Sequence, residues 1–298
     1  EIKGHDAILL GAIGDPRIQV GHLEFGIIAR LRFGLDLYVN LRPVKLYAAH
    51  LCPLKDKTPE QVDFVVVREN TEGFYADRNM AMGHSEILVT DDVAISMRRI
   101  TRVCCERIAQ SAFELARLRQ KRLTLVHKAN VLRITDGLFL QACADVGQDF
   151  PDVSVDDFIV DAMMAHVVRA PEKFDVIVTT NMFGDILSDL TAELSGSLGL
   201  GGSLNAGAQH AMGQAAHGSA PDITGQGKAN PIACILSFAM ALRYSFDQGE
   251  EATRLEKAIE TVLANGARTA DLMGEEGGTP ISTSQMGDAI LEALDASL

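Results

Sequence analysis

Short apolar segments alternate along the chain with longer segments whose apolar residues recur every three or four positions. The short segments are rich in Val, Ile and Leu, as is typical of strands buried on both faces, and the longer ones are typical of amphipathic helices. We expect strands at 6–12, 35–47, 62–70, 122–128, 152–162 and 174–180. We expect helices at 22–33, 91–119, 135–147, from 185 onward, at 230–246 and at 253–266. This alternation predicts an α/β protein with a largely parallel central sheet.

A chain of 298 residues is at or beyond the size at which one hydrophobic core stops growing, so we expect two lobes. One stretch, residues 196–231, differs from the rest because it is rich in Gly, Ala and Ser. Loops of that length are usually functional or disordered. For its last part, residues 217–231, composition alone favours a mobile surface loop.

The formal net charge of −13 argues against binding to nucleic acid or to an anionic membrane surface. No apolar run reaches the ~18 residues that a membrane span needs. The five cysteines are an odd number and lack the spacing of a zinc site, so a reducing cytoplasm is the simplest location. A small anionic substrate is still compatible, because a local arginine cluster can override the overall field.

Two aspartates, Asp185 and Asp189, lie four positions apart in the segment NMFGDILSDL. Gly184 is expected to mark the turn after the strand at 174–180, and both carboxylates then share one helical face. Like charges at this spacing cost about a few tenths of a kcal/mol, so we expect a cation between them. Together with Asp161 they suit Mg²⁺ or Mn²⁺, which prefer carboxylate oxygen. A lone aspartate pair near a helix start is more often a capping feature.

Further polar residues are expected where strands end, which is where α/β sheets bind ligands. Arg42 and Arg68, with Arg32 on the preceding helix, suit an anion that carries more than one carboxylate. Lys128 and Tyr75 are candidates for proton transfer, the lysine if burial and nearby cations lower its pKa. Each of them alone has an ordinary explanation, as an ion pair, a solvated lysine or a core tyrosine. Their joint occurrence at successive strand ends favours a site.

The segment HGSAPDITGQGKANP, residues 217–231, is a second candidate binding element. It contains neither the Rossmann GxGxxG pattern nor a Walker motif. Its small residues would let backbone amides approach a ligand closely, and Asp222 would suit a ribose diol.

Six motifs carry a resemblance to a known family: NLRPVKLY, VVVRENTEGFY, VHKANVL, IVDAMMAH, NMFGDILSDL and HGSAPDITGQGKANP. In this order they resemble the metal-dependent β-hydroxyacid oxidative decarboxylases, which include 3-isopropylmalate, isocitrate, homoisocitrate, tartrate and D-malate dehydrogenases. The likeness covers nearly the whole chain. It implies a two-lobed isopropylmalate-dehydrogenase-like fold with a mixed, largely parallel sheet flanked by helices. A cofactor lobe would contain 1–37 and 197–298, and a lobe for substrate, metal and dimerisation would contain 38–196.

The resemblance also implies how the ligands of the reaction would be held. The carboxylates of a malate-type substrate would be bound by three guanidinium groups, those of Arg32, Arg42 and Arg68. The metal ion, Mg²⁺ or Mn²⁺, would be held by Asp185 and Asp189 together with Asp161 from the neighbouring subunit.

Two residues would carry the proton transfers. Lys128, also from the neighbouring subunit, would take the hydroxyl proton as hydride passes to the nicotinamide. The metal would stabilise the enolate formed by loss of CO₂, and Tyr75 would return a proton to the enol. Sites shared in this way require a homodimer, which in turn could pair into a tetramer.

For the cofactor, the resemblance implies a site for NAD in the second candidate element. The residues concerned are His217, Gly218, Ser219, Ala220, Asp222, Ile223 and Asn230. Asp222 followed by Ile223 resembles NAD users, because a carboxylate would repel the 2′-phosphate of NADP. Two features depart from the family. Its first strand and glycine-rich turn are not in this sequence, which is roughly sixty residues shorter than the family's usual length. Gln214-Ala215-Ala216 also replaces the usual Glu-Pro-Val.

The substrate's third-carbon substituent would face Ile28 and Ala29, which precede Arg32 by four and three positions. An apolar wall suits an isopropyl or small group and would leave a third carboxylate without a partner. RENTEG and the pair His127–Lys128 look more like the isocitrate and homoisocitrate branch, and Arg30 could reach a distal carboxylate. We therefore rank 3-isopropylmalate first, homoisocitrate or isocitrate second, and D-malate or tartrate third.

A non-catalytic regulatory subunit of such a dehydrogenase is an answer of a different class. Regulatory subunits typically lose the lysine, the tyrosine or a metal aspartate. All of these residues are present in this chain, which disfavours that alternative.

Overall fold

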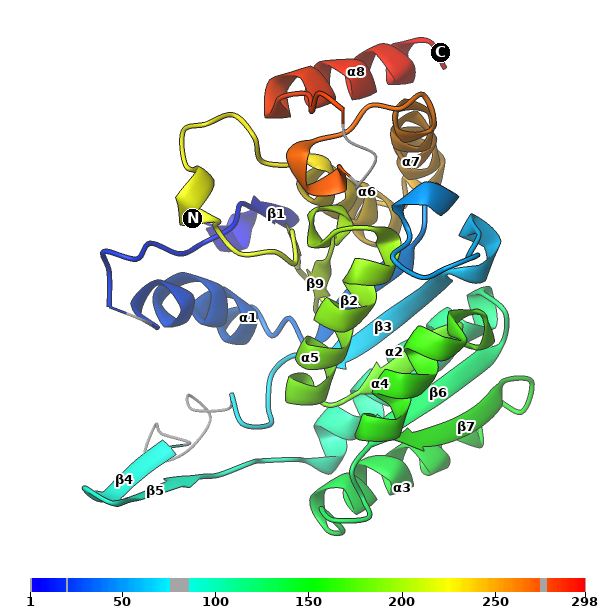
Figure 1. The fold of residues 1–298 in the computed structure, drawn as a ribbon. Helices are drawn as coiled ribbons and strands as arrows, with labels where there is room; N and C mark the ends of the chain where they lie inside the picture. The colour runs from blue at the N-terminus through cyan, green and yellow to red at the C-terminus, as the bar shows by residue number, and fades with distance from the viewer. Residues whose placement is uncertain (1, 20, 76–85, 274–277, 298) are drawn as a thin grey trace.

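One eight-stranded sheet forms the centre of the computed structural model, which describes residues 2–19, 21–75, 86–273 and 278–297 (Figure 1). The order across the sheet is β1-β10-β9-β2-β3-β8-β6-β7. The strands are β1 (Ala7–Leu10), β2 (Val39–Lys45), β3 (Asp63–Glu69), β6 (Arg122–His127), β7 (Ser154–Ile159), β8 (Val176–Thr179), β9 (Leu204–Ala206) and β10 (Ala211–Gln214). β1–β10 and the run β3–β8–β6–β7 are parallel, and the other three pairs are antiparallel. The predicted α/β class with a mixed, largely parallel sheet is confirmed.

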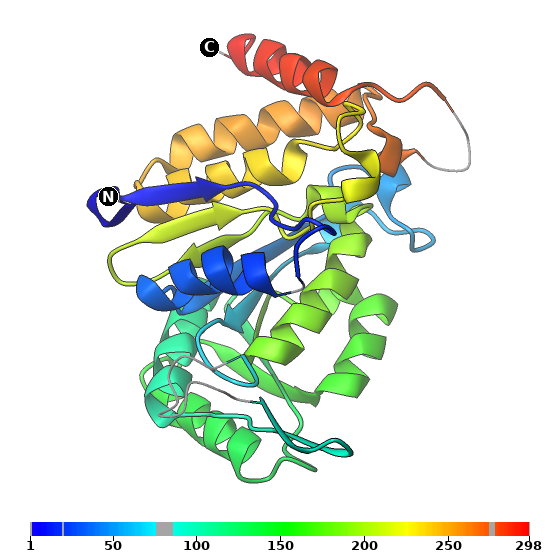
Figure 2. The same cartoon turned by 90° about the vertical axis from the view of Figure 1, so that its left-hand side faces the viewer.

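Helices cover both faces of this sheet. They are the π-helical segment η2 (Glu24–Ala29), α1 (Arg30–Gly34), α2 (Arg102–Leu118), α3 (Thr135–Gly147), α4 (Val160–Arg169), α5 (Asn181–Ala192), α6 (Ile232–Ser245), α7 (Gly249–Ala264) and α8 (Thr283–Asp295). α2 and α3 cover one face of the β3–β8–β6 region, and α4 and α5 cover the other. α6 packs on β10, with α7 and then α8 outside it, as Figure 2 shows. No helix in the described ranges is both long and apolar enough to cross a membrane.

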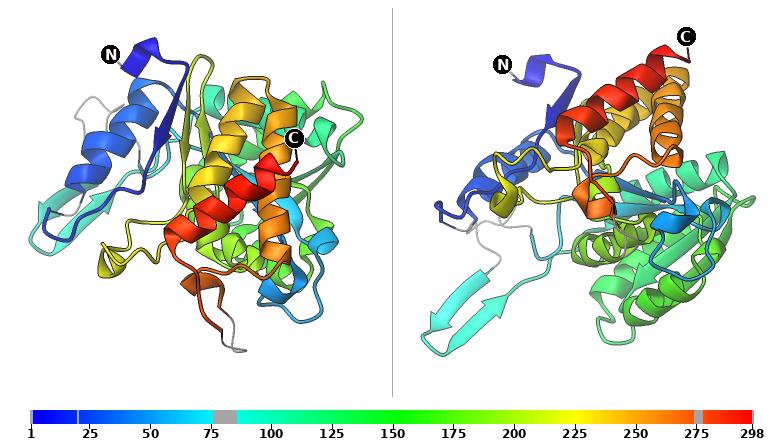
Figure 3. Two further views of the ribbon diagram at one scale, coloured as in Figure 1. Left: turned by 90° about the horizontal axis from the view of Figure 1, so that it is seen from above. Right: turned by 45° about the horizontal axis from the view of Figure 1, so that its top comes forward.

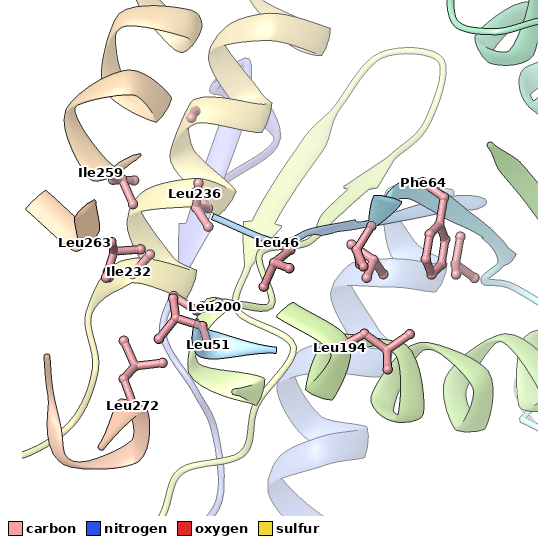
Figure 4. Packing of buried hydrophobic residues seen from close by; sticks show 14 of the residues in the cluster. Leu46, Leu51, Phe64, Leu194, Leu200, Ile232, Leu236, Ile259, Leu263 and Leu272 are labelled. Carbon is pink, nitrogen blue, oxygen red and sulfur yellow. The ribbon is translucent and has the colours of Figure 1, made fainter. Parts of the chain in front are cut away.

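β3 shows why the apolar segments form central strands. Its residues Phe64–Glu69 are all buried, and successive side chains point to opposite faces of the sheet. Val65 and Val67 join the core beneath α2, whereas Phe64 and Val66 join a second core with α4, α5 and α6. Figure 4 shows part of that second core, in which leucines and isoleucines from distant segments meet. Arg68 follows the same alternation and therefore lies on the α5 face.

The predicted helix at 91–119 is wrong in its first third. Residues up to Ser96 form the hairpin of β4 (Glu86–Thr90) and β5 (Val93–Ser96), which projects from the body in Figure 3. α2 begins only at Arg102, where the hydroxyl of Thr101 accepts the N–H of Cys104. The two aspartates at 91–92, which suit a first helical turn, instead connect two strands that are rich in β-branched residues.

The prediction of a loop throughout 196–231 is also wrong, because β9 and β10 lie within this stretch and in the sheet. Its glycines serve close packing of α6 on these strands. A Cβ at Gly202 would meet Leu236 Cβ at 2.8 Å, and one at Gly213 would meet the Ser237 carbonyl oxygen at 2.8 Å. Only residues without a side chain permit that approach.

Two element boundaries also differ from expectation, and one helix was not predicted. α5 begins at Asn181, so Gly184 lies inside the helix and does not mark the turn before it. The strand expected to reach 162 ends at Ile159, which places Asp161 in the first turn of α4. The helix that was not predicted is α8, which follows α7 and begins with a capping box between Ser282 and Gln285.

Candidate active site

The candidate site is built on the face of β2 and β3 that α5 covers. Asn40 and Arg42 are two positions apart in β2, so their side chains point to the same face. Arg68 in β3 is the direct cross-strand partner of Asn40. Strand pairing therefore brings two arginines together beneath α5 although they are far apart in sequence.

Arg68 is held from three sides, with its side chain only 3% exposed. Its Nε and Nη2 donate to Asn181 Oδ1 at 2.9 and 2.7 Å, and its Nη1 is paired with Asp185. Gly184 lies directly over the aliphatic stem, since a Cβ there would meet Arg68 Cγ at 2.7 Å. The start of α5 thus fixes this guanidinium.

Arg42 is equally constrained. Its Nε donates to Asn40 Oδ1 at 2.7 Å and its Nη1 to Ser188 Oγ at 2.6 Å. The same guanidinium lies 3.3 Å from Asp189 Oδ1 and 3.4 Å from Asp185 Oδ1. The cations that face the two aspartates within this chain are therefore Arg42 and Arg68.

Arg32, in α1, completes the predicted arginine set. Burial, followed by repulsion from Arg68 and Arg42, lowers its pKa to about 9. Its Nε is buried and has no hydrogen-bond partner among the described residues. The three arginines are thus gathered, and the third has an unused donor that suits an anion.

The carboxylates predicted to hold a metal fall into two groups. Asp185 and Asp189 share a face of α5, with side chains 38% and 59% exposed. Burial, with a smaller contribution from Asp185, raises the pKa of Asp189 against the opposing effect of the arginines. Asp161 instead pairs with Lys128, which lowers its pKa. In the described ranges no three acidic, Cys or His side chains are placed to hold one metal ion, so Asp161 does not join the other two within one chain.

Lys128 and Tyr75, the residues predicted to move protons, also divide between these groups. Lys128 follows β6, and its backbone N–H donates to the buried Asp136 at 2.6 Å. Tyr75 follows β3, is 41% exposed, and has a pKa raised by burial and then by the nearby Asp185. Tyr75 therefore belongs with the arginines, and Lys128 with Asp161.

A cleft of about 830 Å³ lies at the predicted cofactor element. Six of the seven predicted residues line it: His217, Gly218, Ser219, Ala220, Ile223 and Asn230. The seventh, Asp222, is exposed and is not among the lining residues. Ala220 adopts a left-handed backbone with φ of 44°, a strained conformation of the kind that clusters at ligand sites.

One lining residue that sequence reasoning missed is Asp271. It accepts hydrogen bonds from Ser197 Oγ at 2.6 Å, Asn230 Nδ2 at 3.0 Å and Thr269 Oγ1 at 2.6 Å. Its local partner Thr269 does not indicate a ligand site, and its other two partners, Ser197 and Asn230, are 74 and 41 positions away.

Ile28 and Ala29, predicted to face the substrate's substituent, lie half-buried in the π-helical segment. Arg30, the alternative reader of a third carboxylate, is exposed and lines a separate groove of about 740 Å³. None of the three clustered arginines lines that groove. This placement favours an apolar substituent on the substrate over a third carboxylate bound by Arg30.

Comparison with known proteins gives the same family as the motifs. Residues 1–290 match the family isocitrate/isopropylmalate dehydrogenase. A protein of Cereibacter sphaeroides named 3-isopropylmalate dehydrogenase is 50% identical over 98% of this chain and 82% of its own, and one of Corynebacterium glutamicum with the same name is 44% identical over 99% and 84%. A solved isocitrate dehydrogenase from Methylococcus capsulatus superposes with a TM-score of 0.86 at 39% identity, covering 98% of this chain and 83% of that one. The chain belongs to the isocitrate/isopropylmalate dehydrogenase family.

Proposed function

We propose that this chain is an NAD-dependent decarboxylating dehydrogenase that acts on 3-isopropylmalate with Mg²⁺ or Mn²⁺. The observation that carries the proposal is the gathering of three arginines beside Asp185 and Asp189, near an apolar helix segment. Guanidinium groups bind carboxylates in a fixed, bidentate geometry. The names of the curated relatives support the substrate and a role in leucine synthesis.

The donor set on α5 fits a divalent cation. Asp185 and Asp189 are hard oxygen donors whose partly exposed carboxylates would otherwise repel each other. The third carboxylate, Asp161, would come from a partner subunit. When bound, the ion would supply Lewis-acid polarisation of the substrate.

The chain's own groups would perform the remaining steps. Arg32, Arg42 and Arg68 would orient the two malate carboxylates for hydride transfer from the hydroxyl carbon to NAD. Lys128 Nζ would accept the hydroxyl proton, and the keto acid would then lose CO₂. Tyr75 would donate its phenolic proton to the enol carbon that has lost CO₂, which yields the 2-keto acid product.

The cleft at 217–230 would hold the adenosine end of NAD. The small residues Gly218 and Ser219 would bring backbone groups close to the cofactor. The carboxylate of Asp222, although outside the cleft lining, would repel the 2′-phosphate of NADP. Asn230 is held in place by Asp271.

We also propose that the active unit is a homodimer in the cytoplasm with a cofactor lobe of 1–37 and 197–298 and a second lobe of 38–196, ranges that include residues outside the described ones. With these ranges the lobe division would fall between β9 and β2 in the sheet. Five free cysteines favour a reducing compartment.

The test of the function is NADH formation with Mn²⁺. Each of 3-isopropylmalate, isocitrate, homoisocitrate, D-malate and L-tartrate is supplied separately, with NADP⁺ as the alternative acceptor. The proposal predicts preference for 3-isopropylmalate and NAD⁺. Preference for a tricarboxylate would overturn the assignment of 3-isopropylmalate as the substrate. No turnover with any of the five acids would favour a regulatory subunit.

A subunit-mixing experiment tests the shared site. Lys128→Met and Asp185→Asn should each be inactive alone. In a refolded equal mixture, half of the dimers are mixed and each has one intact site, so about a quarter of wild-type activity should return. A site formed within one chain would give no recovery.

A further inference from the structure

Two buried asparagine side chains link β10 to the guanidinium of Arg42. Arg42 Nε donates to Asn40 Oδ1 at 2.7 Å, and Asn40 Nδ2 donates to Asn205 Oδ1 at 2.9 Å. Asn205 Nδ2 in turn donates to the carbonyl oxygen of Met212 at 3.2 Å. Asn40 and Asn205 are cross-strand partners in the β2–β9 pair, and both are fully buried.

The direction of this hydrogen-bond chain is fixed by its two ends. A guanidinium can only donate, and a backbone carbonyl can only accept. Each amide between them must therefore point its oxygen toward Arg42 and its nitrogen toward Met212. Flipping either amide would place two donors or two acceptors face to face, at the cost of a buried unpaired group.

Asn70 strengthens this arrangement. Its Nδ2 donates to Asn205 Oδ1 at 3.0 Å and to the Leu37 carbonyl at 2.9 Å. Its own oxygen is buried without a partner among the described residues. Asn205 Oδ1 thus receives two donors at once, which further prevents its side chain from turning.

We propose that Asn205 is a positioning residue for substrate binding, which acts on Arg42 through Asn40. The inference rests on the proposed role of Arg42 in holding a substrate carboxylate. Because the holding groups are neutral amides, they fix the Nε edge of the guanidinium without neutralising its charge. Asn205 itself belongs to β9, in the part of the chain that carries the cofactor cleft.

The test compares Asn205→Ala with the matched control Ser203→Ala. Ser203 lies in the same buried segment and donates to the Gln214 carbonyl at 2.5 Å, and among the described residues no hydrogen bond joins its side chain to the arginines. Both variants lose a buried hydrogen bond and should lose thermal stability. Only Asn205→Ala should raise the KM of the hydroxy acid, by about tenfold, while the KM of NAD changes less than about twofold.

A second comparison separates positioning from general damage. In an Arg42→Lys background there is no Nε–H for Asn40 to hold, so Asn205→Ala should change the KM of the hydroxy acid by less than about twofold. A further tenfold rise there would overturn the proposal. Equal KM values for Asn205→Ala and Ser203→Ala in the wild-type background would overturn it as well.

An activity-free measurement keeps this inference distinct from the proposed function. The Nε–H of Arg42, identified in a nitrogen-15 spectrum by its loss in Arg42→Lys, should exchange slowly in wild type and in Ser203→Ala. It should exchange at least about tenfold faster in Asn205→Ala, because the acceptor Asn40 is no longer held. Slow exchange in all three proteins refutes the proposal even if no hydroxy acid is turned over.

Discussion

Replacement of Gly184 by alanine is the sharpest test of the site's packing. An added Cβ would lie 2.7, 2.8 and 3.2 Å from Cγ, Cβ and Cδ of Arg68. The first two distances are shorter than real carbon contacts. Arg68 cannot move its Cβ away, because its backbone pairs with β2 on one side and β8 on the other. The start of α5 must therefore shift.

Gly287 in α8 provides a matched control, because a Cβ there meets nothing within 4 Å. Alanine in place of glycine inside a helix stabilises by about 0.5–1 kcal/mol, so Gly287→Ala should raise Tm. Gly184→Ala gains the same amount but is overpacked, which costs about 1–3 kcal/mol. Its Tm should therefore lie below that of Gly287→Ala.

The shift of α5 should also weaken substrate binding, since Asn181 and Asp185 hold the Arg68 guanidinium. Loss of one hydrogen bond to a charged group costs about 1.5–3 kcal/mol, or roughly 10- to 150-fold in affinity. We expect the KM of the hydroxy acid to rise within this range in NADH assays, with Gly287→Ala unchanged. A Tm for Gly184→Ala that rises as in the control would refute the packing argument. An unchanged KM with a lowered Tm would refute the role of Arg68.

Three further predictions concern charges in and near the site. Arg32→Met should raise the Tm of the ligand-free protein at pH 7, because a pKa of Arg32 lowered to about 9 means that the fold disfavours the charged form. This gain in Tm, measured by scanning fluorimetry, should shrink above pH 9, where the unfolded wild-type chain binds more protons than the folded one. Mn²⁺ should raise the Tm of wild type and not of the Asp185→Asn, Asp189→Asn double variant, and equal shifts would exclude these ligands. Asp271→Ala should raise the KM of NAD several-fold with the KM of the hydroxy acid unchanged, because Asn230 and Ser197 lose their shared acceptor.

The sequence was sufficient where structure depends on neighbouring residues. Val65–Val67 predicted a buried strand, and the spacing of Asp185 and Asp189 predicted a shared helical face, because both patterns are local. The helix predicted from residue 91 failed because two aspartates suit a helix start and a hairpin turn equally well. Only pairing of β4 with β5 decides between them.

Predictions failed where the structural role of a residue depends on contacts with a distant segment. The glycines of 196–231 indicated a loop. In the structure, however, Gly202 and Gly213 leave room for α6, against which an added Cβ at either position would clash. Asn205 is 165 positions from Asn40, and no local pattern distinguishes it from a surface asparagine. The same holds for Asp271, whose partners Ser197 and Asn230 are 74 and 41 positions away.

The negative charges of the two aspartates of α5 are balanced by the positive charges of Arg42 and Arg68. Asp185 provides a counter-charge for Arg68 from within the chain. A substrate carboxylate would compete with Asp185 for the same guanidinium, whereas a cation that binds Asp185 would remove this competitor. Reciprocity then requires that metal and substrate each raise the affinity of the other. The like charges at 185 and 189 are therefore tolerated because both carboxylates pair with cations, the arginines within the chain and the proposed metal ion.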